Sequence, residues 1–172
     1  MGQTTLETER LTLAPLRAEH TDAVVAVFAH KSMSTYIDID FGVEGNAREM
    51  VQRRLAYDGP PRMGHWVILH EGAVVGLGHL RPSWELPGDL PEIGWYLSPD
   101  YGGRGLATEA AAAILRYGLE DLRLNSVWAL VHADNEPSLK LAARLGFLVV
   151  GTGHHYGAEH RIHVALPQPH AF

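Results

Sequence analysis

One stretch, residues 98–109 (SPDYGGRGLATE), most constrains what this chain can fold into. A strand-like run, 92–97, leads into it, a helical run, 108–122, leaves it, and three glycines in four positions stand between the two runs. Glycine permits positive φ and lets a ligand approach the backbone closely. The start of a helix presents unpaired N–H groups at the positive end of its dipole. The stretch therefore predicts an anion site, most often one for phosphate, although a plain glycine-rich turn from strand to helix has the same composition.

The spacing separates this loop from the common nucleotide-binding loops. A Walker loop needs Gly-Lys-Ser/Thr, but Gly105 is followed by Leu106 and Ala107. The dinucleotide fingerprint needs GxGxxG, and the spacing here is GGxG. The segment instead resembles the pyrophosphate loop of the GNAT family, the Gcn5-related N-acetyltransferases, whose pattern Gln/Arg-x-x-Gly-x-Gly/Ala overlays residues 102–107. Gly102 stands where the family prefers Gln or Arg, which loses one side-chain contact but no backbone donor.

This resemblance implies that acetyl-CoA is the cosubstrate and that backbone N–H groups of the loop hold its pyrophosphate. The residues that it implies for coenzyme binding in this part of the chain are Leu97, Gly102, Gly103, Arg104, Gly105, Leu106, Ala107 and Thr108.

A second segment, Asn135-Glu136-Pro137-Ser138 followed by Gly146-Phe147, resembles the other GNAT signature, Asn-x-x-Ser/Ala ending in Gly-Phe. The resemblance implies that Asn135 bonds the pantetheine arm and that the helix flanks the coenzyme. Taken alone, each residue has an ordinary role, because Asn135 suits a helix cap and Gly146 a helix stop. The two signatures together favour coenzyme binding.

Ser138 is the first catalytic candidate. Many family members carry a tyrosine seven positions after the asparagine that protonates the leaving thiolate, and this chain has Ala142 there. Ser138 instead matches a serine of the subgroup that acetylates ribosomal-protein N-termini, where it lies near the coenzyme sulfur. Two roles stay open for Ser138, which are proton donation to the thiolate and an ordinary first-turn hydrogen bond to the backbone.

Glu92 is the second catalytic candidate, and the surrounding PEIGWYL resembles the same subgroup. In a regular strand Glu92, Gly94 and Tyr96 share one face. A carboxylate beside the cleft could take a proton from an ammonium group, directly or through water. The alternative is an exposed or paired glutamate at a strand end.

Hydrophobic periodicity predicts an α/β chain with the element order βααβββαβαββ, which is the GNAT order. The expected fold is one domain over 1–172, a mixed twisted sheet of about seven strands flanked by four helices, with 166–172 as a loose tail. Run 126–131 is nearly all apolar and predicts a central strand, and Pro15 places the first strand near an edge. The expected strands are 10–17, 65–69, 73–80, 92–97, 126–131, 147–152 and 161–166, and the expected helices are 18–30, 46–57, 108–122 and 135–145.

Composition narrows the function classes. The 172 residues carry a net charge of −6, which gives no nucleic-acid footprint. No apolar run approaches the ~20 residues of a membrane span, and the N-terminus has no signal core, so a cytoplasmic protein is expected. The chain has 11 histidines but no cysteine and no HExxH motif, so no metal site is expected. The cluster His154, His155, His160 and His163 is expected to face solvent or, at most, to contact substrate.

The function that the resemblance to the GNAT family implies is transfer of an acetyl group from acetyl-CoA to a primary amine by direct attack in a ternary complex. Two acceptors stay open, a protein N-terminus and a small-molecule amine. The oligomeric state also stays open between monomer and homodimer. Segment 31–45, the loop around Trp84 and the histidine-rich turn would shape the acceptor pocket, and none of them carries a readable code. The alternative class is a non-catalytic acyl-CoA-binding module.

Overall fold

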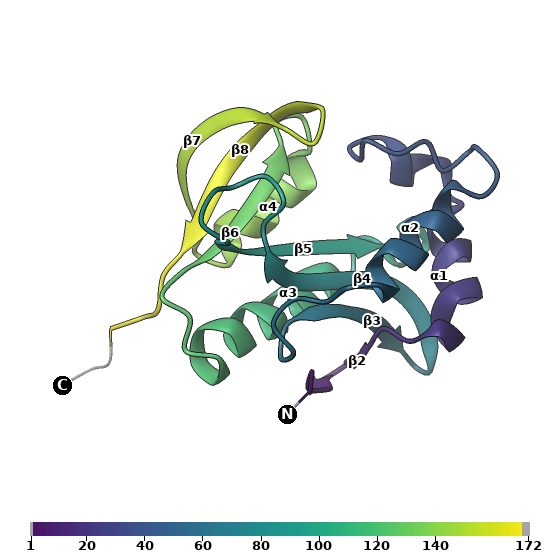
Figure 1. The fold of residues 1–172 in the computed structure, drawn as a ribbon, viewed down its shortest axis with the longest axis horizontal. Coiled ribbons are helices and arrows are strands. Elements are labelled where there is room, and N and C mark those ends of the chain that lie inside the picture. The colour runs from purple at the N-terminus through teal and green to yellow at the C-terminus, as the bar shows by residue number, and fades with distance from the viewer. Residues whose placement is uncertain (1, 170–172) are drawn as a thin grey trace.

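A computed structural model describes residues 2–169 as an α/β fold built on one eight-stranded mixed sheet (Figure 1). The strands follow one another across the sheet in the order β1-β2-β3-β4-β5-β6-β8-β7. Their bounds are β1 Leu6–Glu7, β2 Leu11–Pro15, β3 Gly64–His70, β4 Ala73–Pro82, β5 Pro91–Leu97, β6 Val127–His132, β7 Leu148–His155 and β8 Ala158–Ala165. The predicted class and mixed sheet are confirmed. The additional strand is β1, which spans only Leu6–Glu7 and is too short to carry a periodic signal.

Four α-helices cover the sheet, as predicted. They are α1 Thr21–Phe28, α2 Asn46–Leu55, α3 Leu106–Arg116 and α4 Glu136–Arg144. Helices α1 and α2 pack on one face around Phe28 and Met50, while α3 and α4 pack on the other around Ile114 and Ala142 (Figure 1). The sheet therefore separates two hydrophobic layers.

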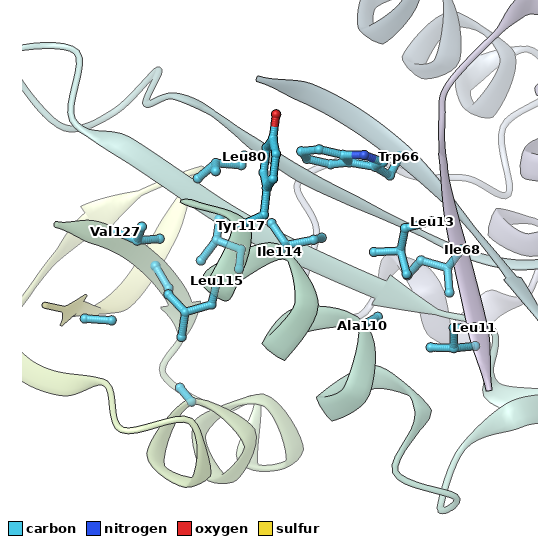
Figure 2. Close-up of a cluster of buried hydrophobic side chains, with 14 of the residues drawn as sticks. Leu11, Leu13, Trp66, Ile68, Leu80, Ala110, Ile114, Leu115, Tyr117 and Val127 are labelled. Atoms are coloured by element: carbon cyan, nitrogen blue, oxygen red, sulfur yellow. The ribbon is translucent and has the colours of Figure 1, made fainter. Parts of the chain in front are cut away.

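The larger layer lies between α3 and the sheet (Figure 2). Ile114 and Leu115 reach toward the strands, and the Tyr117 ring stands edge-on to Trp66 with 5.7 Å between ring centroids. The Tyr117 hydroxyl donates to the carbonyl of Arg62 at 2.7 Å, so this buried phenol keeps a hydrogen bond. This layer fixes the position of α3, and hence of the glycine loop in front of it.

The limits of the predicted helices need correction at both ends of α3. The helix begins at Leu106 rather than at residue 108, because Gly105 adopts φ +76° and acts as its N-cap. Regular α-helix ends at Arg116, and a π-helical turn, Tyr117–Asp121, follows. At Gly118 an added Cβ would stand 3.0 Å from Leu80, so glycine allows the chain to pack directly on the sheet there.

Two other predicted segments also differ from the structure. Segment 18–30 divides into a 3₁₀ turn, Ala18–His20, and α1, and a second 3₁₀ turn, Lys31–Ser34, follows it. The closing strands β7 and β8 are longer than predicted and meet at a tight turn of Tyr156 and Gly157, both with positive φ. Of the predicted tail, residues 166–169 have no regular secondary structure and residues 170–172 lie outside the described part.

The parallel pair β5–β6 positions the site. Every other pair of neighbouring strands is antiparallel, whereas β5 and β6 are parallel and joined at one register point, Glu92 opposite Trp128. Because no further pairing follows, the two strands separate toward Leu97 and His132. A cavity of about 890 Å³ is lined by residues of both strands beyond that point. Within residues 2–169, no helix has the length and apolar character that crossing a bilayer requires.

Candidate functional site

The cavity has two sides. On one side it is lined by the glycine loop, the start of α3 and the first turns of α4, including Asn135 and Ser138. On the other side it is lined by the C-terminal end of α2, by Glu92 and by Tyr156 at the tip of the β7–β8 hairpin. One cavity thus joins the predicted anion loop to both catalytic candidates.

The glycine loop has the backbone that its sequence predicts. Gly103 and Gly105 both adopt φ +76°, a left-handed conformation that favours glycine. The first backbone hydrogen bond of α3 runs from Glu109 N–H to the Gly105 carbonyl at 3.0 Å. The N–H groups before Glu109 therefore have no acceptor within the helix, and they carry the positive end of its dipole. This arrangement can bind an anion through the backbone alone.

Most of the predicted coenzyme residues line the cavity, and one does not. Those lining it are Leu97, Gly102, Gly103, Gly105, Leu106, Ala107, Thr108, Asn135 and Ser138. Arg104 is absent from the lining, and its guanidinium lies 5.5 Å from the Tyr101 ring centroid. Lys140 and Arg144, which sequence reasoning did not name, line the same side from α4 and add positive charge.

A clamp of Thr8, Arg10 and Glu109 holds the loop from behind. Arg10 donates from Nε to Glu109 at 2.8 Å and from Nη1 to the Arg104 carbonyl at 2.9 Å. Thr8 Oγ1 donates to Glu109 at 2.6 Å, and the Arg10 backbone N–H donates to it at 2.9 Å. Burial alone would raise the pKa of Glu109, but these bonds from Thr8 and Arg10 outweigh it and lower the pKa. Glu109 therefore fixes the first turn of α3 to the start of β2.

Asn135 and Ser138 form the turn that opens α4. Asn135 caps the helix, with its Oδ1 accepting from the Ser138 N–H at 3.3 Å. Ser138 Oγ accepts from the Trp95 indole Nε1–H at 3.2 Å. Because Oγ is the acceptor in that bond, the Ser138 hydroxyl proton is free to point elsewhere. The cap geometry and a proton-donor role are compatible.

Glu92 is buried and heavily bonded, with 4% of its side chain exposed. Ser83 Oγ donates to it at 2.6 Å, and the Tyr156 hydroxyl lies 2.9 Å from each of its oxygens. The Arg81 guanidinium lies 3.9 Å away and is itself 3% exposed. Glu92 is thus a paired carboxylate at the edge of the cavity.

The three partners of Glu92, which are Ser83, Tyr156 and Arg81, were not predicted from the sequence. Arg81 stands directly opposite Glu92 in the β4–β5 register, which alternation along two adjacent strands could have revealed. Tyr156 reaches the site from a hairpin turn, at φ +49°, and no local pattern points to it. Burial, and then the charge of Glu92, raise the pKa of the Tyr156 phenol. It therefore stays protonated and donates to the carboxylate.

Two buried imidazoles lie on the same face of the sheet. The rings of His65 and His79 contact each other edge to face, with 5.5 Å between ring centroids. No ring nitrogen of either residue has a hydrogen-bond partner among the described residues. Burial lowers the pKa of His65 to about 2 and also lowers that of His79, so both are neutral near pH 7. At Gly94 an added Cβ would meet the His79 ring at 2.2 Å. Glycine on β5 thus makes room for this imidazole beside the cavity.

The expectation for the C-terminal histidines is partly wrong. His154 is exposed, but His160 and His163 are buried. His160 lines the cavity and His163 packs against Phe147. Strand β8 lies between β6 and β7, so its inward side chains are covered. In residues 2–169, no group of three or more His, Asp or Glu side chains is placed to hold a metal ion.

Known proteins resemble this chain along most of its length. The family model described as an Acetyltransferase (GNAT) domain matches residues 10–148. The uncharacterized N-acetyltransferase p20 of Bacillus licheniformis is 31% identical over 146 residues, covering 83% of this chain and 82% of the relative. The solved acetyltransferase of Agrobacterium tumefaciens strain C58 is 25% identical with a TM-score of 0.76, covering 96% of this chain and 95% of its own. A ribosomal-protein-S5-alanine acetyltransferase from Vibrio fischeri shares the fold, with a TM-score of 0.75 at 16% identity, over 95% of this chain and 97% of its own.

Proposed function

The chain belongs to the GNAT family of acetyltransferases, enzymes that transfer acyl groups from acetyl-CoA, and from that membership we propose that it acetylates a primary amine by direct attack in a ternary complex. The acceptor is a small-molecule amine or a protein N-terminus. The amine attacks the thioester without a covalent enzyme intermediate, which suits a chain with no cysteine.

The residues of the cavity fit the coenzyme. The free N–H groups between Gly103 and Ala107 can bind its pyrophosphate. The gap between β5 and β6 can accommodate its extended pantetheine arm. Lys140 and Arg144 supply positive charge beside that gap. When bound, the coenzyme supplies an acetyl group activated as a thioester, and the chain supplies binding, orientation and proton transfer.

Two side chains are proposed to move the protons. Glu92 accepts the proton that the ammonium must lose before nitrogen can attack, directly or through a water. Ser138 donates its hydroxyl proton toward the departing sulfur, because its oxygen already accepts from Trp95 and its proton is uncommitted. A backbone N–H holds the developing oxyanion.

One observation carries the proposal, namely that the anion-binding loop, Ser138 and Glu92 all line the same cavity. A module that only binds acyl-CoA needs the loop and the gap, but has no use for a carboxylate on the opposite wall. The connection between the two sides favours catalysis over the non-catalytic alternative.

The test is release of free CoA thiol from acetyl-CoA across a panel of primary amines, N-terminal peptides and aminoglycosides. We expect turnover with at least one amine class and loss of turnover in a Gly105→Asp variant. Tight acetyl-CoA binding without release of thiol for any amine would support the non-catalytic module instead.

A further inference from the structure

The wall of the cavity opposite the glycine loop carries an unpaired guanidinium. Arg54 lies in the last turn of α2 and lines the cavity. Its Nε is buried and has no hydrogen-bond partner among the described residues, where no carboxylate forms an ion pair with it either. A buried guanidinium nitrogen without a partner is costly, because water is lost and nothing replaces it.

Other positive charges surround Arg54. Burial lowers the pKa of Arg54, and the neighbouring charges of Arg81 and Arg53 add to that effect. Arg81 is itself buried under the Trp84 ring, with its guanidinium carbon 3.5 Å from the ring centroid. The fold thus holds like charges together at the side of a cavity, which is a feature of binding sites more than of stable cores.

The charged groups on this side of the cavity do not balance. Those that line it are Asp38, Arg53, Arg54, Arg81 and Glu92, three guanidiniums against two carboxylates. Glu92 is already engaged by Ser83, Tyr156 and Arg81. One positive charge is left over. Arg53 and Asp38 are exposed to solvent, and Arg81 pairs with Glu92, so Arg54 is the guanidinium whose buried nitrogen lies in a group with no ion-pair partner among the described residues. A single negative charge on a ligand would complete the set.

We propose that the amine acceptor carries a carboxylate and that Arg54 binds it, so that the substrate class is an amino acid or a similar amino-carboxylate. This inference rests on the proposed acetyl transfer to an amine. A guanidinium presents two parallel N–H donors that match a carboxylate in a bidentate pair. The net charge of this wall suits a monoanion, and it disfavours polyamines, whose second ammonium would face the arginines.

The test compares amines with and without a carboxylate. The 19 common amino acids with a primary α-amine, β-alanine and 4-aminobutyrate are each assayed for CoA-thiol release beside the matching carboxamide, with spermidine as a cationic amine. We expect carboxylates to be preferred over their amides by on the order of 10²-fold in kcat/KM, the usual loss when one member of a buried charge pair is removed.

Two variants assign the preference to a residue. Arg54→Gln should lose most of the preference for carboxylates, measured as the ratio of kcat/KM for each carboxylate to kcat/KM for its matching amide. Arg48→Gln is the matched control, because Arg48 lies on the same helix, pairs with Asp22 at 2.7 Å and does not line the cavity. Thermal melts of both variants, and their affinities for acetyl-CoA, check that neither change acts through folding or through the coenzyme.

The outcomes separate the two proposals. Turnover of amides or spermidine in preference to carboxylates, or an equal carboxylate preference in Arg54→Gln, overturns the role of Arg54 but leaves acetyl transfer standing. Absence of turnover with every amine, despite acetyl-CoA binding, overturns acetyl transfer. In that case, the carboxylate site at Arg54 is tested by calorimetry, with each amino acid titrated into CoA-loaded protein. Binding to the wild type that is lost in Arg54→Gln supports this site, and absence of binding to the wild type rejects it.

Discussion

The hydroxyl of Tyr156 lies 2.9 Å from both carboxylate oxygens of Glu92, and so ties the tip of the β7–β8 hairpin to the strand that enters the glycine loop. The two residues are 64 positions apart in the sequence. Ser83 holds the same carboxylate from a third segment, at 2.6 Å. Three parts of the chain therefore converge on the carboxylate of Glu92, which fixes its position whether it transfers a proton or only holds the fold.

The pH–rate profile distinguishes these two roles. Glu92→Gln keeps the shape of the side chain and removes the base, so kcat/KM should fall by about 10²-fold or more at pH 7. The loss should shrink at high pH, because the free amine accumulates and no longer needs a base. Parallel profiles of similar magnitude for wild type and variant would show that Glu92 is structural.

Tyr156→Phe serves as the partner variant for that measurement. It keeps the ring but removes the donor to Glu92, so the base remains with one fewer bond to fix it. We expect a smaller loss than in Glu92→Gln and less recovery at high pH. A Tyr156→Phe loss as large as that of Glu92→Gln would indicate that the phenol itself takes part.

Coenzyme binding should depend on the absence of a side chain at Gly105. Gly105→Asp introduces a negative charge where the loop is proposed to hold phosphates, so acetyl-CoA affinity should be lost while the fold persists. Gly105→Ala is the control, because it shares the φ of +76° and its strain of about 1–2 kcal/mol without the charge. Isothermal calorimetry should find weak acetyl-CoA binding by Gly105→Ala and none by Gly105→Asp. Equal affinities of Gly105→Asp and the wild type would reject the proposal that this loop holds the phosphates.

Ser138 should affect chemistry more than binding. Ser138→Ala removes the proposed proton donor, and kcat should fall by about 10²-fold if thiolate departure limits the rate. Acetyl-CoA affinity should change little. Trp95→Phe is the control, since it removes the bond to Ser138 Oγ but leaves the hydroxyl in place. Wild-type kcat in Ser138→Ala, with chemistry rate-limiting, would leave Ser138 with its role in the first turn of α4.

The fold and the glycine-loop side of the cavity could be predicted from the sequence because their signals are local. Gly105, Asn135 and Gly146 mark helix limits within a few residues of the elements that they bound. The start of α3 was predicted two residues too late. Its N-cap is a glycine in the left-handed conformation, which has no polar side chain of the kind that marks a helix start in a sequence.

The opposite side of the cavity could be predicted only in part, because most of its residues meet only through the tertiary fold. Glu92, segment 31–45 and Trp84 were named from the sequence and contribute to the lining, but Arg54, Arg81 and Tyr156 were not named. Arg54 comes from α2, Arg81 from β4 and Tyr156 from a hairpin turn, and each is an ordinary residue of its own element. Their significance depends on burial and on partners distant in sequence. Periodicity also could not show that β8 lies inside β7, which is what buries His163.

The clamp of Thr8, Arg10 and Glu109 leads to a prediction about stability and pH. The hydrogen bonds that Glu109 accepts lower its pKa in the folded protein below the unfolded value of about 4.3. A carboxylate of this kind stabilises the fold above the unfolded pKa, and the contribution is lost as pH falls through the folded pKa. Glu109→Gln should therefore lower the free energy of unfolding by about 1–2 kcal/mol at pH 7.

The effect of the same substitution should be smaller at pH 3, because pH 3 lies below the unfolded pKa and the stability from the carboxylate falls as pH drops toward its lowered folded pKa. Denaturant unfolding at both pH values measures the difference, with Glu120→Gln, an exposed glutamate further along the same chain segment, as control. Because Arg10 also holds the Arg104 carbonyl, loosening the clamp should weaken acetyl-CoA binding as well as stability. A stability gap of equal size at pH 7 and pH 3 would mean that the ionised carboxylate is not its source, and that packing at the start of α3 is.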